Sequence, residues 1–440
     1  MTSPEPQSRN TKARVAKIII AGATALALAG IGGATALLLP NTPEGEFAEL
    51  PAEYMYDSLP AADTGLGSLA WAWEAGISEA MQAGDKEAFL AYSSGAAKEK
   101  MSRWWDSTKA IGWDVGFATA GIGENDQHVL TLGVQLAFSS HPIRGSGSPD
   151  SGLMLTQNFP YSLTVEGDDD DLTITDWEPL FPMPWDFGDI YVAKRDHVVL
   201  YGLANEAALV DANIDLAEQS AELTLSTLAN IGGTSPVDGF VAVITDDEQG
   251  FNTWLGKDEL DWTMDVAGFA RSTQRPDYPS DTIPAGVATG STSSGSLVAM
   301  GPSSADQRQS TFVHEFAHVL HEAAVPYDYW GYQEPAPAEG FARYFENAAG
   351  VGRDYFEFQE VGQAIAANGE YAMSEEALRN QDAWIAYAAA GSFYQYVADS
   401  GGSAWQLALD RDNGFSMSLR ARLQSPEFSE AGWQAWAAGH

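Results

Sequence analysis

The stretch Thr311–Leu320 reads TFVHEFAHVL, and it holds two of only seven histidines in a chain of 440 residues. On a helix, residues four apart lie about 6 Å apart along the axis and within roughly 40° of one another around it. His314 and His318 therefore share one face, and both imidazoles can reach a single metal ion. The sequence predicts a metal-binding helix here.

Glu315 adds a reactive group to this pair. The pattern His-Glu-x-x-His on a helix binds zinc through both histidines, and its glutamate acts as the base for a zinc-bound water. The metal lowers the pKa of that water towards 7, so a neighbouring carboxylate can take its proton. We therefore expect His314 and His318 as zinc ligands and Glu315 as the catalytic base.

A catalytic zinc site needs a third protein ligand besides water. His321 lies about 10 Å further along the helix than His314, so we expect it around the site or on the surface. The later stretch EPAPAEGFARYFENAAG offers three carboxylates, Glu334, Glu339 and Glu346. Glu334 precedes two prolines and Glu346 lies two turns beyond the middle one, so Glu339 is the preferred third ligand.

Glu339 is followed by glycine at the expected start of a second helix, 21 residues after the second histidine of the motif. In this arrangement the region from about 196 to 400 resembles the gluzincin metallopeptidases. The resemblance implies a zinc site of His314, His318 and Glu339, with Glu315 as base. The tryptophan that usually precedes the family's Glu-Gly is absent from this chain.

A tyrosine further along the chain resembles another gluzincin element. In aminopeptidase-like members, a tyrosine in a Tyr-x-x-Gly context stabilises the oxyanion that forms when water attacks the peptide carbonyl. Tyr387 and Gly391 in WIAYAAAGSFYQYV match that element with one extra residue. Tyr344 and Tyr394 are the alternatives, and a core tyrosine on an alanine-rich helix is an equally good interpretation.

Gluzincins also place an edge strand along the cleft before the motif helix, where a substrate can add as another strand. The resemblance implies that Ser296–Pro302, SLVAMGP, is this strand. In the aminopeptidases that strand carries Gly-Ala-Met-Glu-Asn, and its glutamate holds the free amine of the substrate. Here Ala299 and Met300 are followed by Gly301, so the glutamate is missing. The resemblance therefore favours an endopeptidase over an aminopeptidase.

The composition limits the classes of partner. The chain has 22 Lys and Arg against 61 Asp and Glu, a formal charge of -39. A field of that sign repels nucleic acid and anionic lipid surfaces, so we expect no nucleic-acid partner. The absence of cysteine excludes disulfides, cysteine zinc sites and thiol catalysis. No pattern indicates an oligomeric state.

The N-terminus predicts one membrane anchor. Residues 1–17 carry four basic side chains, and residues 18–39 form an uncharged run long enough to cross the roughly 30 Å core of a bilayer. By the positive-inside rule, 1–17 is cytoplasmic and the bulk lies outside the cell membrane. The alternative is secretion after cleavage of a signal peptide near Ala34–Ala36.

Beyond the anchor we expect an α+β chain in three parts. Residues 40–60 are rich in proline and glutamate and are typical of a linker. Residues 61–195 combine a helical stretch with shorter strands and resemble the NTF2-like fold, a small α+β domain with a curved, cone-like sheet. Residues 196–440 form the metallopeptidase-like domain, with a mostly helical C-terminal part; His197 at its start is expected to be structural.

These patterns predict a membrane-anchored, extracytoplasmic zinc metallopeptidase that acts on a peptide or protein substrate. The first alternative is a non-catalytic surface binding or scaffold protein whose zinc site is degenerate or structural. A second alternative is that the N-terminal domain carries the function and binds a small ligand.

Overall fold

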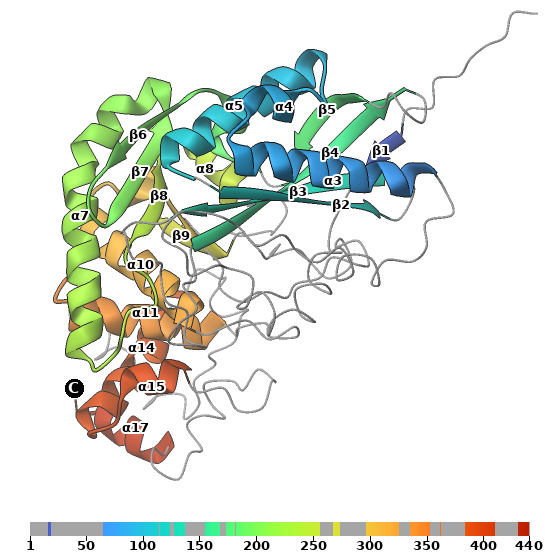
Figure 1. Cartoon of the computed structure of the whole chain (residues 1–440). Helices are drawn as coiled ribbons and strands as arrows, with labels where there is room; N and C mark the ends of the chain where they lie inside the picture. The colour runs from blue at the N-terminus through green and yellow to red at the C-terminus, as the bar shows by residue number, and fades with distance from the viewer. Residues whose placement is uncertain are drawn as a thin grey trace, which may run out of the picture.

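Figure 1 shows the computed structural model of the whole chain. The structure describes residues 16–18, 65–113, 115–123, 127–136, 155–167, 173–180, 182–255, 267–272, 296–324, 335–352, 361, 383–409 and 430–439. These residues form helices and strands in two sheets, so the expected α+β class is confirmed.

The first sheet is antiparallel throughout. Its order is β1-β4-β3-β2, with β5 paired to β4. The bounds are β1 Ala16–Ile18, β2 Val115–Gly123, β3 Gln127–Leu136, β4 Leu155–Glu166 and β5 Thr173–Pro179. Apart from β1, these strands lie within residues 61–195, the region for which the sequence predicts shorter strands.

Three helices cover this sheet, with bounds α3 Gly65–Ala83, α4 Lys86–Leu90 and α5 Gly95–Ile111 (Figure 1). Aromatic side chains fill the space between the two layers. The rings of Tyr161 and Trp177 lie 4.3 Å apart between centroids, and Phe89 stacks on Trp104 at 5.6 Å. The sequence predicts this combination of helices and strands for the unit. Its assignment to the NTF2-like fold stays a prediction.

The second sheet is mixed, in the order β6-β7-β8-β10-β9. Its strands are β6 Ile190–Lys194, β7 Val198–Leu203, β8 Phe240–Ile244, β9 Gly268–Ser272 and β10 Ser296–Met300. The three central strands are parallel, and the two outer strands run antiparallel to their neighbours. Because β6 and β7 pair as a hairpin, the second sheet begins at Ile190, whereas the sequence predicts a domain boundary after residue 195.

The expected position of the edge strand is wrong. The stretch 296–302 contains β10, which lies between β8 and β9 and is not at the edge. Val298, Ala299 and Met300 are fully buried in succession, and such a run is typical of a strand that is covered on both faces. The outer strand on this side is β9, whose Gly-Phe-Ala-Arg-Ser sequence gives little signal of a strand.

The second sheet separates two hydrophobic cores. Val198 and Leu200 pack into one core, and the alternate residues Val199 and Tyr201 pack into the other. Successive side chains of a strand point to opposite faces, so β7 contributes to both. The second core also contains the aromatic residues of the first unit, so the two units share one packed interior.

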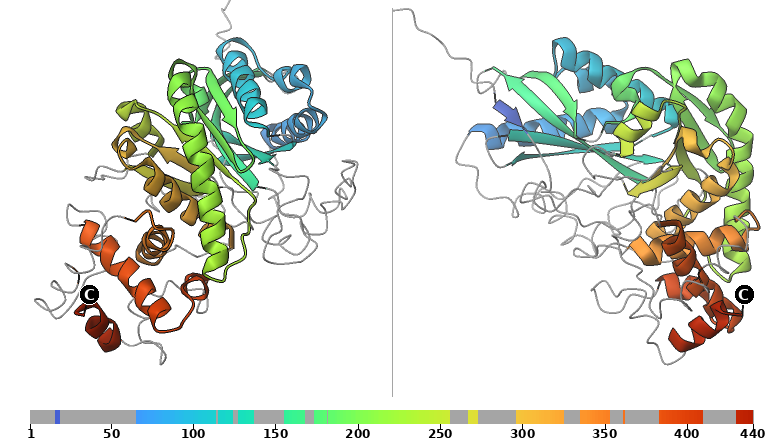
Figure 2. Two further views of the ribbon diagram at one scale, coloured as in Figure 1. Left: turned by 90° about the vertical axis from the view of Figure 1, so that its left-hand side faces the viewer. Right: turned by 180° about the vertical axis from the view of Figure 1, so that it is seen from behind.

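Helices cover the other face of the second sheet and extend away from it. Two short helices contribute Trp185 and Phe251 to the second core: α6 Pro184–Phe187 precedes β6, and α8 Glu248–Leu255 lies between β8 and β9. The longer ones are α7 Ala207–Asn230, α10 Arg308–Ala324, α11 Pro335–Ala348 and α14 Ala383–Asp399, followed by α15 Ala404–Leu409 and α17 Glu430–Ala437. Figure 2 shows α7 running along the sheet, and the C-terminal helices at the end of the molecule opposite α3–α5.

The predicted N-terminal segments lie almost entirely outside the described residues. The exception is Ala16–Ile18, which forms β1 against β4; Ile18 thus ends a strand where the sequence predicts the first residue of a helix. The rest of the predicted anchor and the linker at 40–60 are not described. Among the helices that the structure does describe, none has both the length and the apolar character needed to cross a bilayer.

Gly340 lets α11 approach α14 closely, and this contact gives the first prediction. A Cβ atom at Gly340 would lie 2.8 Å from the Cβ of Ala390 and 2.9 Å from its backbone carbonyl atoms. Helix propensity alone favours alanine over glycine by about 1 kcal/mol. We expect Gly340→Ala to destabilise instead, by about 1–3 kcal/mol, because a backbone contact cannot yield like a flexible side chain.

The measurement is thermal unfolding of the purified protein, with a fall in Tm of about 2–6 °C expected. Gly188→Ala is the matched control, since a Cβ there meets only Leu203 Cδ2 at 3.8 Å, an ordinary contact. Equal Tm values for the Gly340→Ala variant and the wild type would contradict this account of the helix crossing.

Candidate metal centre

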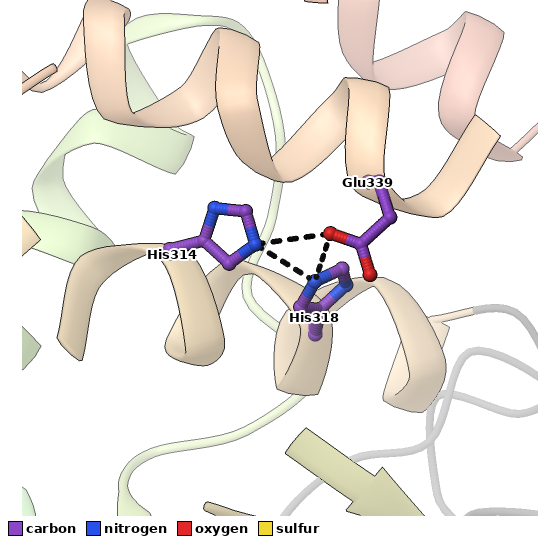
Figure 3. Close-up of side chains that lie close together, drawn as sticks. All are labelled: His314, His318 and Glu339. Carbon is purple, nitrogen blue, oxygen red and sulfur yellow. Dashed lines mark hydrogen bonds and ion pairs between the residues drawn. The ribbon is translucent and has the colours of Figure 1, made fainter. Parts of the chain in front are cut away.

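The predicted motif helix is confirmed as α10, which packs on the second sheet. Its apolar residues Phe312 and Phe316 are fully buried, and Phe316 stacks on Phe240 of β8 with ring centroids 4.1 Å apart. The apolar face fixes the rotation of the helix against the sheet. His314 and His318 are consequently directed towards α11 (Figure 3).

Glu339 on α11 meets the histidine pair, as the sequence predicts. Its Oε2 lies 3.1 Å from Nε2 of His314 and 3.3 Å from Nε2 of His318. The two Nε2 atoms lie 3.2 Å from each other, so three potential ligand atoms form a small triangle (Figure 3). The structure thus brings together three residues from two helices, although His318 and Glu339 are 21 positions apart in the chain.

The size of this triangle fits a zinc ion. Nitrogen and oxygen ligands bind zinc at about 2.0–2.2 Å, and two such ligands at a tetrahedral angle lie about 3.3 Å apart. Two imidazoles with one carboxylate also suit zinc and other first-row divalent metals. Calcium and magnesium prefer sites made only of oxygen ligands, so the donor set disfavours them.

The charges at the site favour a bound cation. Burial lowers the pKa of His314, but hydrogen bonds to Glu339 and Glu346 outweigh it and raise this pKa well above its usual range. The pKa of His318 is also raised, because Glu339 outweighs the opposite effect of burial. Burial raises the pKa of Glu339, yet the two histidines hold it far below its usual range. Without a metal ion, protons supply the positive charge that these carboxylates attract.

Glu346 is not a rival ligand, which corrects one of the alternatives from the sequence. Its Oε1 lies 2.5 Å from Nδ1 of His314, on the side of the ring away from the triangle. Its Oε2 accepts a hydrogen bond of 2.7 Å from Nη1 of Arg343. Seven residues separate it from Glu339, so both share one face of α11 and reach opposite nitrogens of the same ring. The other alternative, Glu334, lies outside the described residues.

Glu315 is buried beside the ligands, between α10 and the outer strand β9. Burial raises its pKa to about 7, although the positive charges of His314 and His318 act in the opposite direction. A Cβ at Gly268 of β9 would lie 3.2 Å from Cγ of Glu315 and 2.8 Å from Cγ2 of Thr311. Gly268 therefore leaves the space that Glu315 occupies, a role that the sequence alone did not reveal.

Of the three candidate tyrosines, two belong to the core. Tyr394 is fully buried, and its ring stacks on that of Tyr344 at 6.3 Å between centroids. Tyr387 is only partly buried and lies one turn before Ala390, the residue of α14 that contacts α11. It therefore remains the candidate for the oxyanion-stabilising group. Gly391 has a packing role, because a Cβ there would lie 3.0 Å from Cβ and Cγ of Arg343.

His321 lies in the core and not on the surface. It is 4% exposed, and its Nε2 lies 2.8 Å from the carbonyl oxygen of Ala408 in α15. Its ring also packs against Phe341 of α11 at 5.6 Å between centroids. His321 thus links three helices, and the triangle of ligand atoms does not include it.

A second group of potential metal ligands lies between the β6–β7 turn and α7, where His197 of the turn meets Glu218 and Glu222 of the helix. Nδ1 of His197 lies 2.7 Å from Oε1 of Glu218, and the same carboxylate accepts a hydrogen bond from the backbone N–H of His197. Glu222 is exposed. The contacts fasten the β6–β7 hairpin to α7, which agrees with the structural role expected for His197.

Comparison with known proteins does not identify the chain. No protein-family model matches it, and no curated protein matches its sequence. The arrangement of side chains at the site is therefore the main basis for a functional proposal.

The pKa directions at the site predict how zinc affinity depends on pH. Zinc must displace the protons of His314 and His318, and their raised pKa values extend this competition to higher pH. We expect the affinity to fall as the pH is lowered from 8 to 6, by at most about 100-fold per pH unit, because up to two protons are displaced. Competition with a fluorescent chelator measures it, and an affinity that stays constant over this range would contradict the assignment.

Proposed function

We propose that the chain is a zinc-dependent peptidase of the gluzincin type. The observation that carries the proposal is the triangle of His314, His318 and Glu339 ligand atoms with a buried carboxylate, Glu315, at its side. A zinc ion held by these residues would act as a Lewis acid and make a water molecule nucleophilic near neutral pH.

Two side chains of the protein then carry out proton transfer and stabilisation of the oxyanion. Glu315 accepts the proton of the attacking water and passes it to the leaving amine, which is general acid–base catalysis. Its buried position, which raises its pKa to about 7, suits a group that must both take and give a proton near neutral pH. Tyr387 donates a hydrogen bond to the oxyanion as negative charge develops on the peptide carbonyl.

The outer strand supports a peptide as the substrate. In the described part of the chain β9 pairs with β10 on one side only, and Gly268 at its start lies against Glu315. An extended peptide that adds to β9 as a further strand would pass close to the base. Met300 is followed by Gly301, so the chain lacks the glutamate that holds the free amine of the substrate in aminopeptidases. We therefore propose an endopeptidase.

The cellular location is also a proposal. The uncharged run at 18–39 after a basic segment supports a single-pass anchor in the cell membrane, with the catalytic unit outside. Secretion after signal-peptide cleavage would place the same unit in the same compartment. The net charge of -39 disfavours nucleic acid as a partner.

A purely structural zinc site fits the geometry less well. Structural zinc sites are closed by four protein ligands, whereas the described residues supply three at this triangle. The side chain of Glu339 keeps 23% of its surface exposed, so water can reach this part of the site. A structural site also has no use for Glu315 beside the metal.

Replacement of the base tests the reaction. We expect Glu315→Gln to lower hydrolysis of a mixed peptide library by about 10²–10⁴-fold, since an amide cannot accept the proton. Zinc content should stay at the wild-type level, because Glu315 is not a ligand. Glu322→Gln, a matched change on the same helix, should keep full activity. Equal turnover by the Glu315→Gln variant and the wild type would rule out this mechanism.

Replacement of the oxyanion donor tests the role of Tyr387. We expect Tyr387→Phe to lower kcat by about 10²-fold and leave KM and zinc content nearly unchanged, since the hydrogen bond forms mainly in the transition state. Tyr396→Phe on the same helix α14 serves as control and should retain activity. A Tyr387→Phe variant with wild-type kcat would show that another group stabilises the oxyanion.

A further inference from the structure

We propose that Arg343 is a positioning residue that sets the metal affinity of the site through Glu346 and His314. The inference rests on the proposed zinc site and extends it to a residue that touches neither the metal position nor a substrate. Three side chains form a continuous hydrogen-bonded series, from Arg343 Nη1 to Glu346 Oε2 at 2.7 Å and from Glu346 Oε1 to His314 Nδ1 at 2.5 Å.

The carboxylate of Glu346 is held in place by Arg343. Its side chain is 5% exposed and that of Arg343 is 9% exposed, so water does little to stabilise the charge of either group. A buried carboxylate keeps its charge and its orientation only where other groups satisfy both oxygens. Arg343 satisfies one oxygen, which leaves the other free to accept a hydrogen bond from His314.

The imidazole of His314 is oriented by the carboxylate of Glu346. A charged carboxylate can only accept hydrogen bonds, so Nδ1 of His314 must carry the hydrogen that faces Glu346. In a neutral ring the lone pair then lies on Nε2, which points at the triangle with His318 and Glu339. Fixing the tautomer in this way also fixes the ring orientation and makes the ligand nitrogen more basic.

The space around Arg343 is limited by the neighbouring helix α14. Gly391 of α14 has no side chain, and a Cβ there would lie 3.0 Å from Cβ and Cγ of Arg343. The stem of Arg343 thus fits closely between α11 and α14. Arg343 also follows Glu339 by four residues, so one face of α11 carries both the ligand and the support for His314.

A double-mutant cycle tests the series. The variants are Arg343→Met, Arg343→Lys, Glu346→Gln and the double variant Arg343→Met with Glu346→Gln, in the purified full-length protein. Zinc affinity is measured by competition with a chelator, and the absorption spectrum of the cobalt-loaded protein reports the ligand geometry. Arg195→Met is the matched control, because Arg195 forms an exposed ion pair with Asp215 on α7.

We expect Arg343→Met to weaken zinc binding by about 10–100-fold and to change the cobalt spectrum. Arg343→Lys should recover part of the affinity, since it restores a positive charge without the planar fork. In the Glu346→Gln background, Arg343→Met should lower the zinc affinity by less than threefold, because Arg343 acts on the site through Glu346. The Arg195→Met variant should bind zinc like the wild type.

Two results would overturn the proposal. One is wild-type zinc affinity and an unchanged cobalt spectrum in Arg343→Met, or in Glu346→Gln should the methionine variant not fold. The other is a full 10–100-fold loss from Arg343→Met in the Glu346→Gln background. Because neither measurement uses a substrate, a protein that binds zinc and hydrolyses no peptide would refute the peptidase proposal and leave this one standing.

Discussion

The site depends on one electrostatic constraint: two imidazole nitrogens and a carboxylate oxygen lie within 3.3 Å of one another. All three atoms carry lone pairs, so this arrangement needs positive charge at its centre. Protons supply the charge in the metal-free protein. The pKa values of both histidines are raised because the neighbouring carboxylates stabilise the protonated rings. A divalent cation supplies more charge at a single point, which is why the geometry favours a metal.

The fold holds this arrangement through two helix contacts. Packing of Phe312 and Phe316 against the second sheet fixes the rotation of α10 and with it the direction of both histidines. Close approach of α11 to α14 at Gly340 fixes the height of Glu339 above them. The first unit stabilises the same sheet from its other face, so it contributes to the rigidity of the site without a residue in it.

The sequence predicted the part of the site that depends on helix periodicity. The four-residue spacing of His314 and His318 and the Glu-Gly step at Glu339 needed only local geometry. The sequence did not predict β9 as the outer strand, because five residues with a glycine and an arginine give a weak β pattern. It also misplaced Glu346 among the possible ligands, since spacing along α11 does not say which nitrogen of His314 a carboxylate reaches. Such contacts depend on how two helices cross, and a single sequence does not encode that crossing locally.

The most direct test of the proposed metal centre is metal content together with zinc X-ray absorption on the purified protein, wild type beside Glu339→Ala. The account predicts one zinc per wild-type chain, with two imidazole nitrogens and a carboxylate oxygen among the ligands. It also predicts zinc binding at least about 100-fold weaker in the variant, more than the loss of an outer partner costs. Equal zinc content and an unchanged absorption spectrum in the Glu339→Ala variant would contradict it.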